Sequence, residues 1–451
     1  MTVNRRMFLR ATSAVAVAGV ASAALAACGS GSKDSSGSAA DADPSAAADA
    51  AEQGGELLVW AWDNTIEPCA QAFMEKYPKV KVTVTNVGTS ADQYTALQNA
   101  VSAGKGGPDV AQIEYFALQQ FSISESLVDL TAFGAAEYEG TFTEGPWSAV
   151  RSGDGVYGLP LDSGPMAMFY NEEVFTSLGV EVPTTWDEYL DAARKIHAAD
   201  PSKYIAADTG DAGATLSGLW QAGVSPYSVK GTEVSIDFSG PEAERYAELQ
   251  TTMIKEDLLA PISGWTDEWF QGLGDGTIAT LVLGAWMPGN FISSVPQASG
   301  KWRVAPQPRW EADKPACAEN GGSSLAAMKD SKNQALAYAF MQFCSAQEGI
   351  QVRIDGGAFP STVAELESEE FLGKEFEYFG GQKANEVLSQ AAKDVLPGWT
   401  YLPFQVYANS IFNDHVGKAY TSKGATTISD GLASWRDACI TYGKQQGFTI
   451  A

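Results

Sequence analysis

Aromatic and carboxylate side chains follow the ends of three apolar segments. Trp62 and Asp63 end the run ELLVWAWD, Glu114 and Tyr115 end PDVAQIEY, and Trp286 ends TIATLVLGAW. A flat ring can cover an apolar ligand face, while carboxylates and amides hydrogen-bond to a polar rim. These residues predict a binding site for a small molecule with an apolar face and several hydroxyl groups, and no catalytic residue is expected.

Further candidates lie where an aromatic ring, an acid or an amide adjoins a turn or a segment boundary. They are Asp162, Trp220, Trp265, Asn320, Gly321, Tyr401 and Gln405. Trp60 stands two positions before Trp62 on the same strand face and is expected in the core. Structural roles remain open for all of them, because a lone aromatic ring in a strand usually packs in a core. Asp63 has the alternative of capping the next helix.

Alternating strand and helix patterns must position these residues. The expected strands cover residues 56–62, 77–87 and 108–115, and the expected helices lie between them at 66–77 and 92–107. Strand, helix, strand, helix, strand predicts a parallel α/β layer. Ligands of such open sheets bind beyond the carboxyl ends of the strands, which is where the three aromatic and polar clusters fall.

Later segments continue the alternation. Strands are expected at 155–162, 166–171 and 277–286, and helices at 186–199, 335–346 and 428–447. Thr185 with Glu188 is a capping box ahead of the first of these helices, and Ser331 with Gln334 is a second capping signal.

The N-terminus predicts export. Arg5 and Arg6 precede the apolar run at 11–27, which is too short and too rich in alanine for a membrane span. The paired arginines resemble a twin-arginine signal, and LAAC resembles a lipobox that would make Cys28 the lipidated first residue. Residues 28–53, rich in Gly, Ser, Ala and Asp, are expected to be a flexible tether. An ordinary cleaved signal with a chance cysteine is the alternative.

Composition excludes several classes of partner. The formal net charge is −26, with 55 acidic and 29 basic residues, so nucleic acid is not an expected partner. The chain has two histidines and no CxxC pair, so neither a metal site nor a cofactor is expected. Cys69, Cys317, Cys344 and Cys439 allow two disulfides in an oxidising compartment, with three pairings open.

The order of several segments resembles a known family. LLVWAWDNTIEPCAQAFMEKYPKVKVTV, YGLPLDSGPMAMFYNEEVFTSLGVEVPTTWDEYLDAARKI and FQGLGDGTIATLVLGAW occur in this order. They are similar to extracellular solute-binding proteins of carbohydrate ABC importers, the maltose-binding-protein-like group (solute-binding family 1). The resemblance covers nearly the whole chain from about residue 55 onward.

The resemblance implies a two-lobed, periplasmic-binding-protein-like type II α/β fold with crossing hinge strands. One lobe would hold 55–161 and 307–356, and the other 162–306 and 357–451, with the signal peptide at 1–27. The hinge would lie near 160–163 and Pro306. It further implies that a sugar binds in the cleft, that the lobes close on it, and that the protein delivers it to a membrane permease. The protein would be a monomer, lipid-anchored on the extracellular face of the cytoplasmic membrane.

Other classes of function remain open from the sequence. Acidic and aromatic residues also suit a polyamine, and a binding protein for a polyol would need similar side chains. A secreted glycoside hydrolase would need aromatic rings and two carboxylates, which abound in an acidic chain. A surface scaffold for a protein partner is the third alternative.

Overall fold

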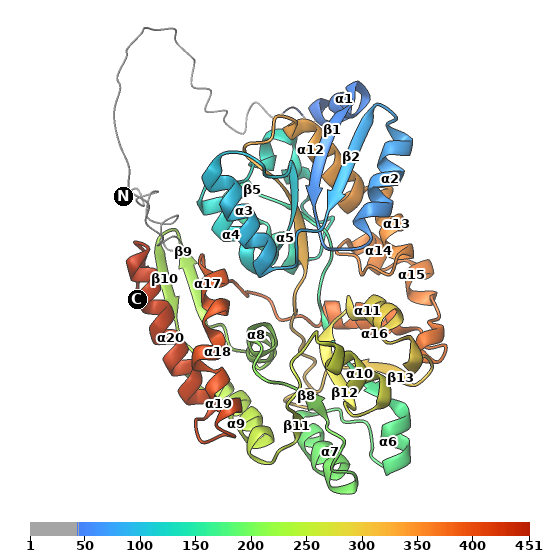
Figure 1. Ribbon diagram of the computed structural model, residues 1–451, viewed down its shortest axis with the longest axis vertical. Coiled ribbons are helices and arrows are strands. Elements are labelled where there is room, and N and C mark those ends of the chain that lie inside the picture. The colour runs from blue at the N-terminus through green and yellow to red at the C-terminus, as the bar shows by residue number, and fades with distance from the viewer. Residues whose placement is uncertain (1–42, 44) are drawn as a thin grey trace.

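The computed structural model describes residue 43 and residues 45–451. The predicted signal peptide, Cys28 and most of the predicted tether lie outside these residues. Two lobes, each with its own sheet, lie one above the other in Figure 1, and the chain passes between them more than once. The predicted two-lobed α/β fold is confirmed.

The upper lobe is built on a five-stranded sheet in the order β2-β1-β3-β14-β6. Its strands are β2 (Val80–Thr85), β1 (Gly55–Trp60), β3 (Val110–Glu114), β14 (Ser323–Ala327) and β6 (Leu159–Pro160). β1 pairs in parallel with both β2 and β3, as the alternating pattern predicts. β14 pairs with β3 in antiparallel orientation, although it comes from a much later part of the chain.

Helices of the upper lobe pack around this sheet (Figure 1). They are α2 (Ile66–Lys76), α3 (Ala91–Ala103), α4 (Tyr115–Ile123), α5 (Glu144–Ala149), α12 (Gln334–Ala346) and α13 (Gly349–Asp355). The face of α2 predicted from its apolar spacing is buried, since Ile66, Cys69, Ala70 and Phe73 belong to the core. The helices at 66–76 and 91–103 therefore confirm the sequence expectation.

A helix replaces the last part of the predicted tether. α1 (Ser45–Gln53) packs against α12, and Ala47 and Ala51 are each 1% exposed. Both alanines lie one helical turn apart, so their small side chains face the same neighbour. Alanine has the highest helix propensity, so a composition expected to stay flexible forms a helix once a partner surface is present.

The lower lobe contains an antiparallel sheet in the order β12-β7-β13. Its strands are β12 (Thr280–Gly284), β7 (Met166–Asn171) and β13 (Trp302–Pro306). The longer helices of this lobe are α7 (Trp186–Ala199), α8 (Ala212–Gln221), α9 (Pro241–Lys255), α10 (Asp267–Asp275), α11 (Met287–Ser294), α16 (Ala384–Lys393) and α20 (Ile428–Gln445). The capping box of α7 is confirmed, because Glu188 N donates to Thr185 Oγ1 at 3.2 Å and Thr185 N donates to Glu188 Oε2 at 3.3 Å.

Two local predictions are wrong. Ser331 does not cap the helix at 335–346, because α12 begins at Gln334 with Asn333 as its N-cap residue. The hydroxyl of Ser331 instead donates to Asp109 Oδ1 at 2.5 Å and accepts from Asn333 N at 3.1 Å. The strand expected at 155–162 is split into β5 (Gly155–Val156) and β6.

The second connection between the lobes differs from the predicted one at Pro306. Pro306 ends β13 inside the lower sheet, where it pairs with Ala167. The connection lies at 318–322, where Asn320 N donates to Gly164 O at 2.8 Å beside the first connection at 161–165. The predicted boundary between the lobes at residue 307 is therefore too early, because the backbone of Cys317 still forms a β-bridge with Val395 of the lower lobe.

The structure contains no disulfide among the four cysteines it describes. Cys69, Cys317, Cys344 and Cys439 are buried free thiols. Cys69 Sγ and Cys344 Sγ lie 2.9 Å apart between α2 and α12. Cys317 and Cys439 belong to separate hydrophobic clusters, and the two disulfides that the cysteine count allows are not formed. Among the described residues, no helix is both long and apolar enough to cross a bilayer.

Candidate functional site

A buried amide fixes the carboxyl end of β1. Gln112, in the middle of β3 and 2% exposed, accepts hydrogen bonds through Oε1 from Trp62 N and Asp63 N, each at 3.0 Å. Its Nε2 donates to Ser323 Oγ of β14 at 2.9 Å. Gln112 therefore orients the loop that carries the predicted residues. A glutamine within the strand VAQIE, flanked by Ala and Ile, was the signal that the sequence analysis missed.

Trp62 and Glu114 face the space beyond the upper sheet. The half-buried ring of Trp62 meets Tyr94 edge-on, with the ring centroids 6.5 Å apart. Tyr94 OH donates to Glu114 Oε2 at 2.8 Å. Burial raises the pKa of Glu114 to about 7, against the lowering effect of hydrogen bonds from Ser90 and Tyr94. Glu114 is therefore a carboxyl that can both donate and accept near neutral pH.

Asp63 has a structural role. Its Oδ1 accepts from Thr65 N at 2.8 Å, at the start of α2, and its Oδ2 lies 3.1 Å from Arg353 Nη2. The Arg353 side chain is 2% exposed and also donates to the backbone oxygen of Leu161. Asp63 is not the cap of α2, because the N-cap residue is Thr65, which has no side-chain cap hydrogen bond; Asp63 instead closes the turn before the helix and pairs with Arg353.

Asp162 and Tyr115 support the first connection between the lobes. Asp162 Oδ1 accepts from Ser323 N at 2.6 Å and from Ser323 Oγ at 2.9 Å. Tyr115 OH donates to Asp162 O at 2.6 Å. Burial raises the pKa of Asp162 to about 6, and the Arg353 guanidinium opposes the shift.

Trp286 and Trp265 form an aromatic pair on the lower lobe. Their ring centroids are 5.6 Å apart with planes 30° from parallel, and Trp265 is 50% exposed. The indole nitrogen of Trp286 donates to Asn320 O at 2.8 Å. Trp265 has φ +67°, a strained conformation for a bulky residue that is often found at functional sites. The structure thus brings three predicted residues, Trp265, Trp286 and Asn320, to one place.

The connecting segment is shaped to accept the Trp286 ring. Gly321 has φ +76°, and a Cβ there would stand 3.1 Å from Trp286 Nε1. Asn320 Nδ2 donates to Ser217 Oγ of α8 at 3.3 Å. Gly321 therefore serves close packing of the indole rather than presenting a polar group of its own.

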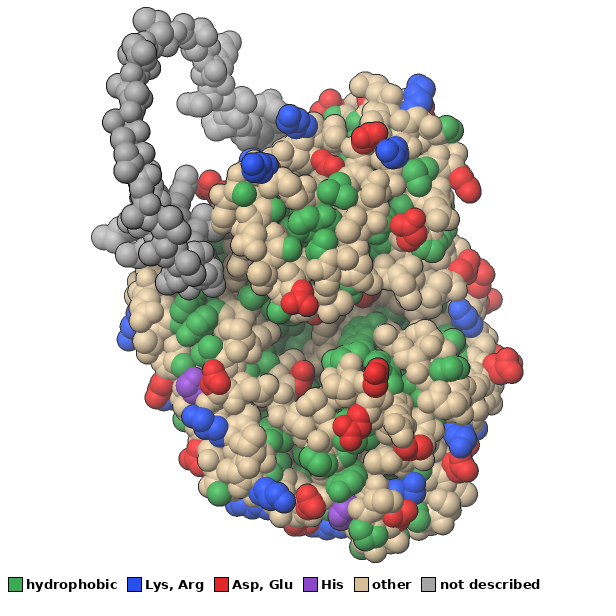
Figure 2. All heavy atoms as spheres, in the orientation of Figure 1, with side chains coloured by type: hydrophobic (Ala, Val, Ile, Leu, Met, Phe, Trp, Pro, Cys, Tyr) green, Lys and Arg blue, Asp and Glu red, His purple; other side chains and the backbone are tan. Residues whose placement is uncertain are grey.

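The two lobes face each other at this point. Asp211, the N-cap residue of α8, adjoins the connecting segment, because a Cβ on Gly213 would stand 3.2 Å from Asp211 Oδ1 and 3.6 Å from Asn320 Nδ2, and its charge is a minor cause of the raised pKa of Glu114. We name Trp62, Glu114, Asp211, Trp265, Trp286 and Asn320 the cleft site. Figure 2 shows a hollow between the lobes with hydrophobic side chains inside it. Asp211 is a residue that the sequence analysis missed.

Three other predicted residues line a separate cavity. Tyr115, Trp220 and Tyr401 border a space of about 350 Å³. Trp220 stacks on Trp399 with ring centroids 4.8 Å apart and planes 7° from parallel. Its nitrogen donates to Leu396 O at 2.8 Å. Trp220 is 6% exposed, so it packs within the lower lobe and reaches this cavity only at its edge.

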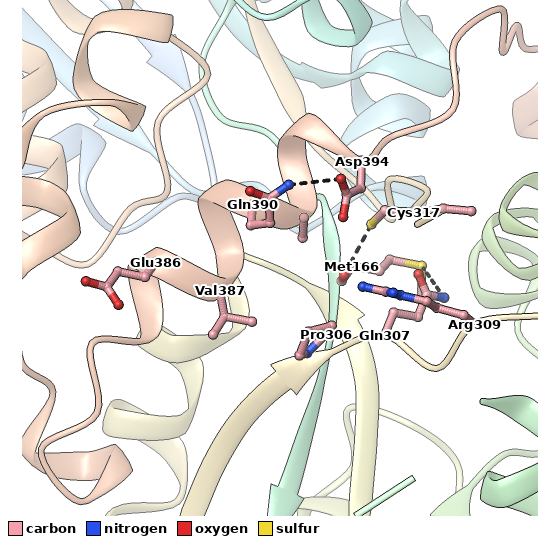
Figure 3. A pocket seen from close by; sticks show the side chains of 11 residues that line it. Met166, Pro306, Gln307, Arg309, Cys317, Glu386, Val387, Gln390 and Asp394 are labelled. Atoms are coloured by element: carbon pink, nitrogen blue, oxygen red, sulfur yellow. Dashed lines mark hydrogen bonds between the residues drawn. The ribbon is translucent and has the colours of Figure 1, made fainter. Parts of the chain in front are cut away.

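Gln405 lies apart from both hollows. It is fully buried, its Oε1 accepts from Leu402 N at 3.2 Å, and its Nε2 donates to Asn409 Oδ1 at 2.8 Å. A third hollow of about 270 Å³ adjoins Pro306 and Cys317 and is lined by none of the predicted ligand residues (Figure 3). In it, Gln390 Nε2 donates to Asp394 Oδ1 at 2.9 Å.

Neither histidine takes part in a cluster. His197 Nδ1 lies 2.9 Å from Lys203 O, and His415 Nδ1 lies 2.7 Å from Ser434 Oγ. Within residues 45–451, no group of three or more His, Cys, Asp or Glu side chains is placed to hold a metal ion.

Two α/β lobes joined by crossing segments, with an aromatic and a carboxyl group at strand ends of one lobe and an aromatic pair on the other, define a two-lobed binding protein. Residues 62–351 match the family described as bacterial extracellular solute-binding protein. The chain belongs to this family.

Solved structures of sugar-binding proteins are similar over most of the chain. The ABC transporter associated binding protein from B. animalis subsp. lactis Bl-04, in complex with beta-1,6-galactobiose, is 45% identical with a TM-score of 0.82. The match covers 88% of this chain and 99% of that chain. The galacto-N-biose-/lacto-N-biose I-binding protein from Bifidobacterium longum, in complex with lacto-N-biose, is 25% identical with a TM-score of 0.76, covering 88% and 99%.

Two relatives found by sequence similarity are also named for the sugars that they bind. The lactose-binding protein of Rhizobium radiobacter is 24% identical over 73% of this chain and 80% of its own length. The arabinooligosaccharide-binding protein of Bacillus subtilis (strain 168) is 25% identical over 65% of this chain and 70% of its own length.

Proposed function

We propose that the cleft site binds a short oligosaccharide and that the protein delivers it to the permease of an ABC importer. The observation that carries the proposal is that the aromatic pair Trp265 and Trp286 lies beside a connection between the lobes, while Trp62 and Glu114 stand at strand ends of the other lobe. A pyranose has an apolar C–H face that an indole covers well. Its hydroxyl groups each donate and accept, which suits a carboxyl whose pKa lies near neutrality.

Binding is coupled to closure of the lobes. Because the residues of the cleft site come from both lobes, a sugar contacts all of them only when the lobes are together. The closed form is therefore favoured by the ligand, and it is the form that we expect to dock on the permease. Each polar group left unpaired on closure costs about 1–3 kcal/mol, so a sugar with the wrong hydroxyl arrangement is rejected.

Similar proteins indicate the class of sugar. The 45% identical structure holds beta-1,6-galactobiose, and other relatives are named for lacto-N-biose, lactose and arabinooligosaccharide. We therefore take a short oligosaccharide as the ligand class and β-1,6-galactobiose as the first compound to test.

Asp162 and Gly321 contribute to sugar binding indirectly, because both hold the connecting segments between the lobes in place.

The proposed cellular setting follows from the N-terminus. Lipidation of Cys28 would retain a monomer on the extracellular face of the cytoplasmic membrane, after twin-arginine export, within reach of the permease. We propose transport without catalysis, so release of reducing sugar from oligosaccharides is not expected. A polyamine or polyol ligand is the competing proposal.

Calorimetric titration of the purified protein tests the proposal. β-1,6-galactobiose is expected to bind in a 1:1 complex, whereas sorbitol is expected to give no heat, and any heat from spermidine is expected to be the same in Trp265→Ala. Trp265→Ala should weaken sugar binding without lowering the melting temperature, because this ring is half exposed. Ile292→Ala, which removes a comparably exposed apolar side chain from α11, is the matched control. Sugar binding that is unchanged in Trp265→Ala would contradict the assignment of the cleft site.

A further inference from the structure

The cavity beside Tyr401 is separate from the cleft site. Its upper wall comes from α4 and α5, through residues such as Gln119 and Ser148, and its lower wall comes from Trp399 and Lys393. Glu319 lines it, but no residue of the cleft site does. Its volume of about 350 Å³ falls in the usual range for small-molecule sites, about 300–1,000 Å³.

Glu319 places a carboxyl without a partner in the wall of this cavity. The residue is 7% exposed, and no side chain or backbone group in the described part of the chain hydrogen-bonds to its carboxyl oxygens. A Cβ on Gly145 would stand 3.4 Å from Glu319 Oε2, so the carboxyl extends from the connecting segment to α5. Such an unpaired buried acid requires a physical explanation.

The charges around Glu319 are of the same sign. Burial raises its pKa to about 8, and repulsion from Asp162 adds to the shift. Glu144 and Glu367 add carboxylates among the lining residues. The Lys393 ammonium is paired with Glu367 at 3.1 Å, on the exposed part of both side chains. Within residues 45–451, no cation is therefore placed to pair with Glu319.

Aromatic rings complete the cavity. Trp399 stacks on Trp220, and the ring centroid of Trp399 lies 6.0 Å from that of Tyr401. Ring faces attract cations, most strongly where water is excluded. A buried carboxyl beside indole and phenol rings is a combination that suits an ammonium group on an apolar body, because the cation pairs with the acid and the body covers the rings.

We propose that this cavity is a second binding site, for a small organic amine whose ammonium pairs with Glu319 and whose apolar part packs against Trp399 and Tyr401. The two sites share no residue, but the cavity has one wall from each lobe, so the inference is tested in the absence of sugar.

Titration with an amine and its neutral counterpart tests this inference. The probes are 2-phenylethylamine and 2-phenylethanol, added to the purified protein in the absence of sugar and followed by calorimetry. The amine is expected to bind in a 1:1 complex and the alcohol at least about tenfold more weakly, the effect of one charge-assisted hydrogen bond. Equal binding of both compounds, or no binding of the amine, overturns the proposal.

Substitutions of Glu319 and Glu144 test whether the amine binds at Glu319. Glu319→Gln keeps the shape of the side chain and should weaken the amine about tenfold. Glu144→Gln makes the same substitution at an exposed position of the cavity rim and should leave the affinity within about twofold. Glu319→Asp, which withdraws the carboxyl, replaces Glu319→Gln if the latter does not fold. Equal losses in the Glu319 and Glu144 variants would show general charge attraction and overturn the proposed site.

Discussion

The indole nitrogen of Trp286 donates to the backbone oxygen of Asn320 at 2.8 Å, which ties the aromatic pair of the lower lobe to a connection between the lobes. Trp286→Phe keeps an aromatic ring but removes this hydrogen bond. We expect a loss of about 1 kcal/mol in the free energy of unfolding, measured in urea, and a larger fractional loss in affinity for β-1,6-galactobiose, measured by calorimetry.

Trp302→Phe is the matched control for Trp286→Phe. Trp302 is fully buried in the lower lobe, and its Nε1 has no hydrogen-bond partner in the described structure. Its replacement should alter stability through packing while leaving sugar affinity unchanged. An equal loss of affinity in both variants would mean that Trp286 acts only through the stability of the lobe.

Gly164 tests the close packing of the two connections. A Cβ at this position would overlap the carbonyl oxygen of Asn320, which belongs to the backbone and has no rotamer to escape into. Gly164→Ala should therefore lower the melting temperature and weaken sugar binding. Gly373→Ala, where a Cβ meets nothing within 4 Å, should change neither quantity in differential scanning fluorimetry and titration.

Asp63 is expected to matter more for stability than for ligand binding. Asp63→Asn keeps an oxygen that can accept from Thr65 N but leaves the buried Arg353 guanidinium without its carboxylate. Removing one partner of a buried ion pair costs about 3–5 kcal/mol. Chemical denaturation measures this loss, and the affinity for sugar in the remaining folded protein should change little.

An exposed ion pair gives the comparison for Asp63. Glu348 Oε1 lies 2.7 Å from Lys76 Nζ, with both side chains more than a third exposed. Glu348→Gln should cost about 0–1 kcal/mol, because water screens such pairs. A similarly small cost for Asp63→Asn would refute the structural role assigned to Asp63.

The raised pKa of Glu319 should make the free energy of unfolding depend on pH. An unfolded glutamate has a pKa of 4.5, whereas burial raises the pKa of folded Glu319 to about 8. Between these values the folded state binds more protons than the unfolded state, so the free energy of unfolding falls as pH rises. The stabilisation is complete below pH 4.5 and is lost as pH rises through about 8.

Glu319→Gln removes this contribution. The difference in unfolding free energy between the native protein and the variant should decline from pH 4.5 to about 8 and stay constant above it. Glu144→Gln, at an exposed site, should give a pH profile parallel to that of the native protein over this window. A constant difference for Glu319→Gln across the range would show that its pKa is not raised.

Local sequence signals were sufficient for much of the fold. The strands ending at Trp60 and Glu114 and the capping box of Thr185 were predictable because alternation, apolar spacing and capping are properties of adjacent residues. The position of β14 and the connection at 318–322 were not, because pairing across some 200 residues leaves no local pattern. Likewise α1 depends on the surface of α12, not on its own composition.

The candidate site was predictable in part for the same reason. Trp62, Glu114 and Trp286 stand where strands end, as expected, and their assignment to a sugar site stays a proposal. The roles of Gln112 and Glu319 arise from burial and from what faces them, which composition and spacing do not contain.

The late arrival of β14 has a consequence for biosynthesis. This strand lies in the interior of the upper sheet, between β3 and β6, and Ser323 is paired with Glu114. While the ribosome is still making the lower lobe, the edge of β3 stays unpaired, and an open strand edge invites aggregation. The nascent chain therefore exposes this edge until residue 327 has been made, and a fragment that stops at residue 161 would lack the strand that closes it.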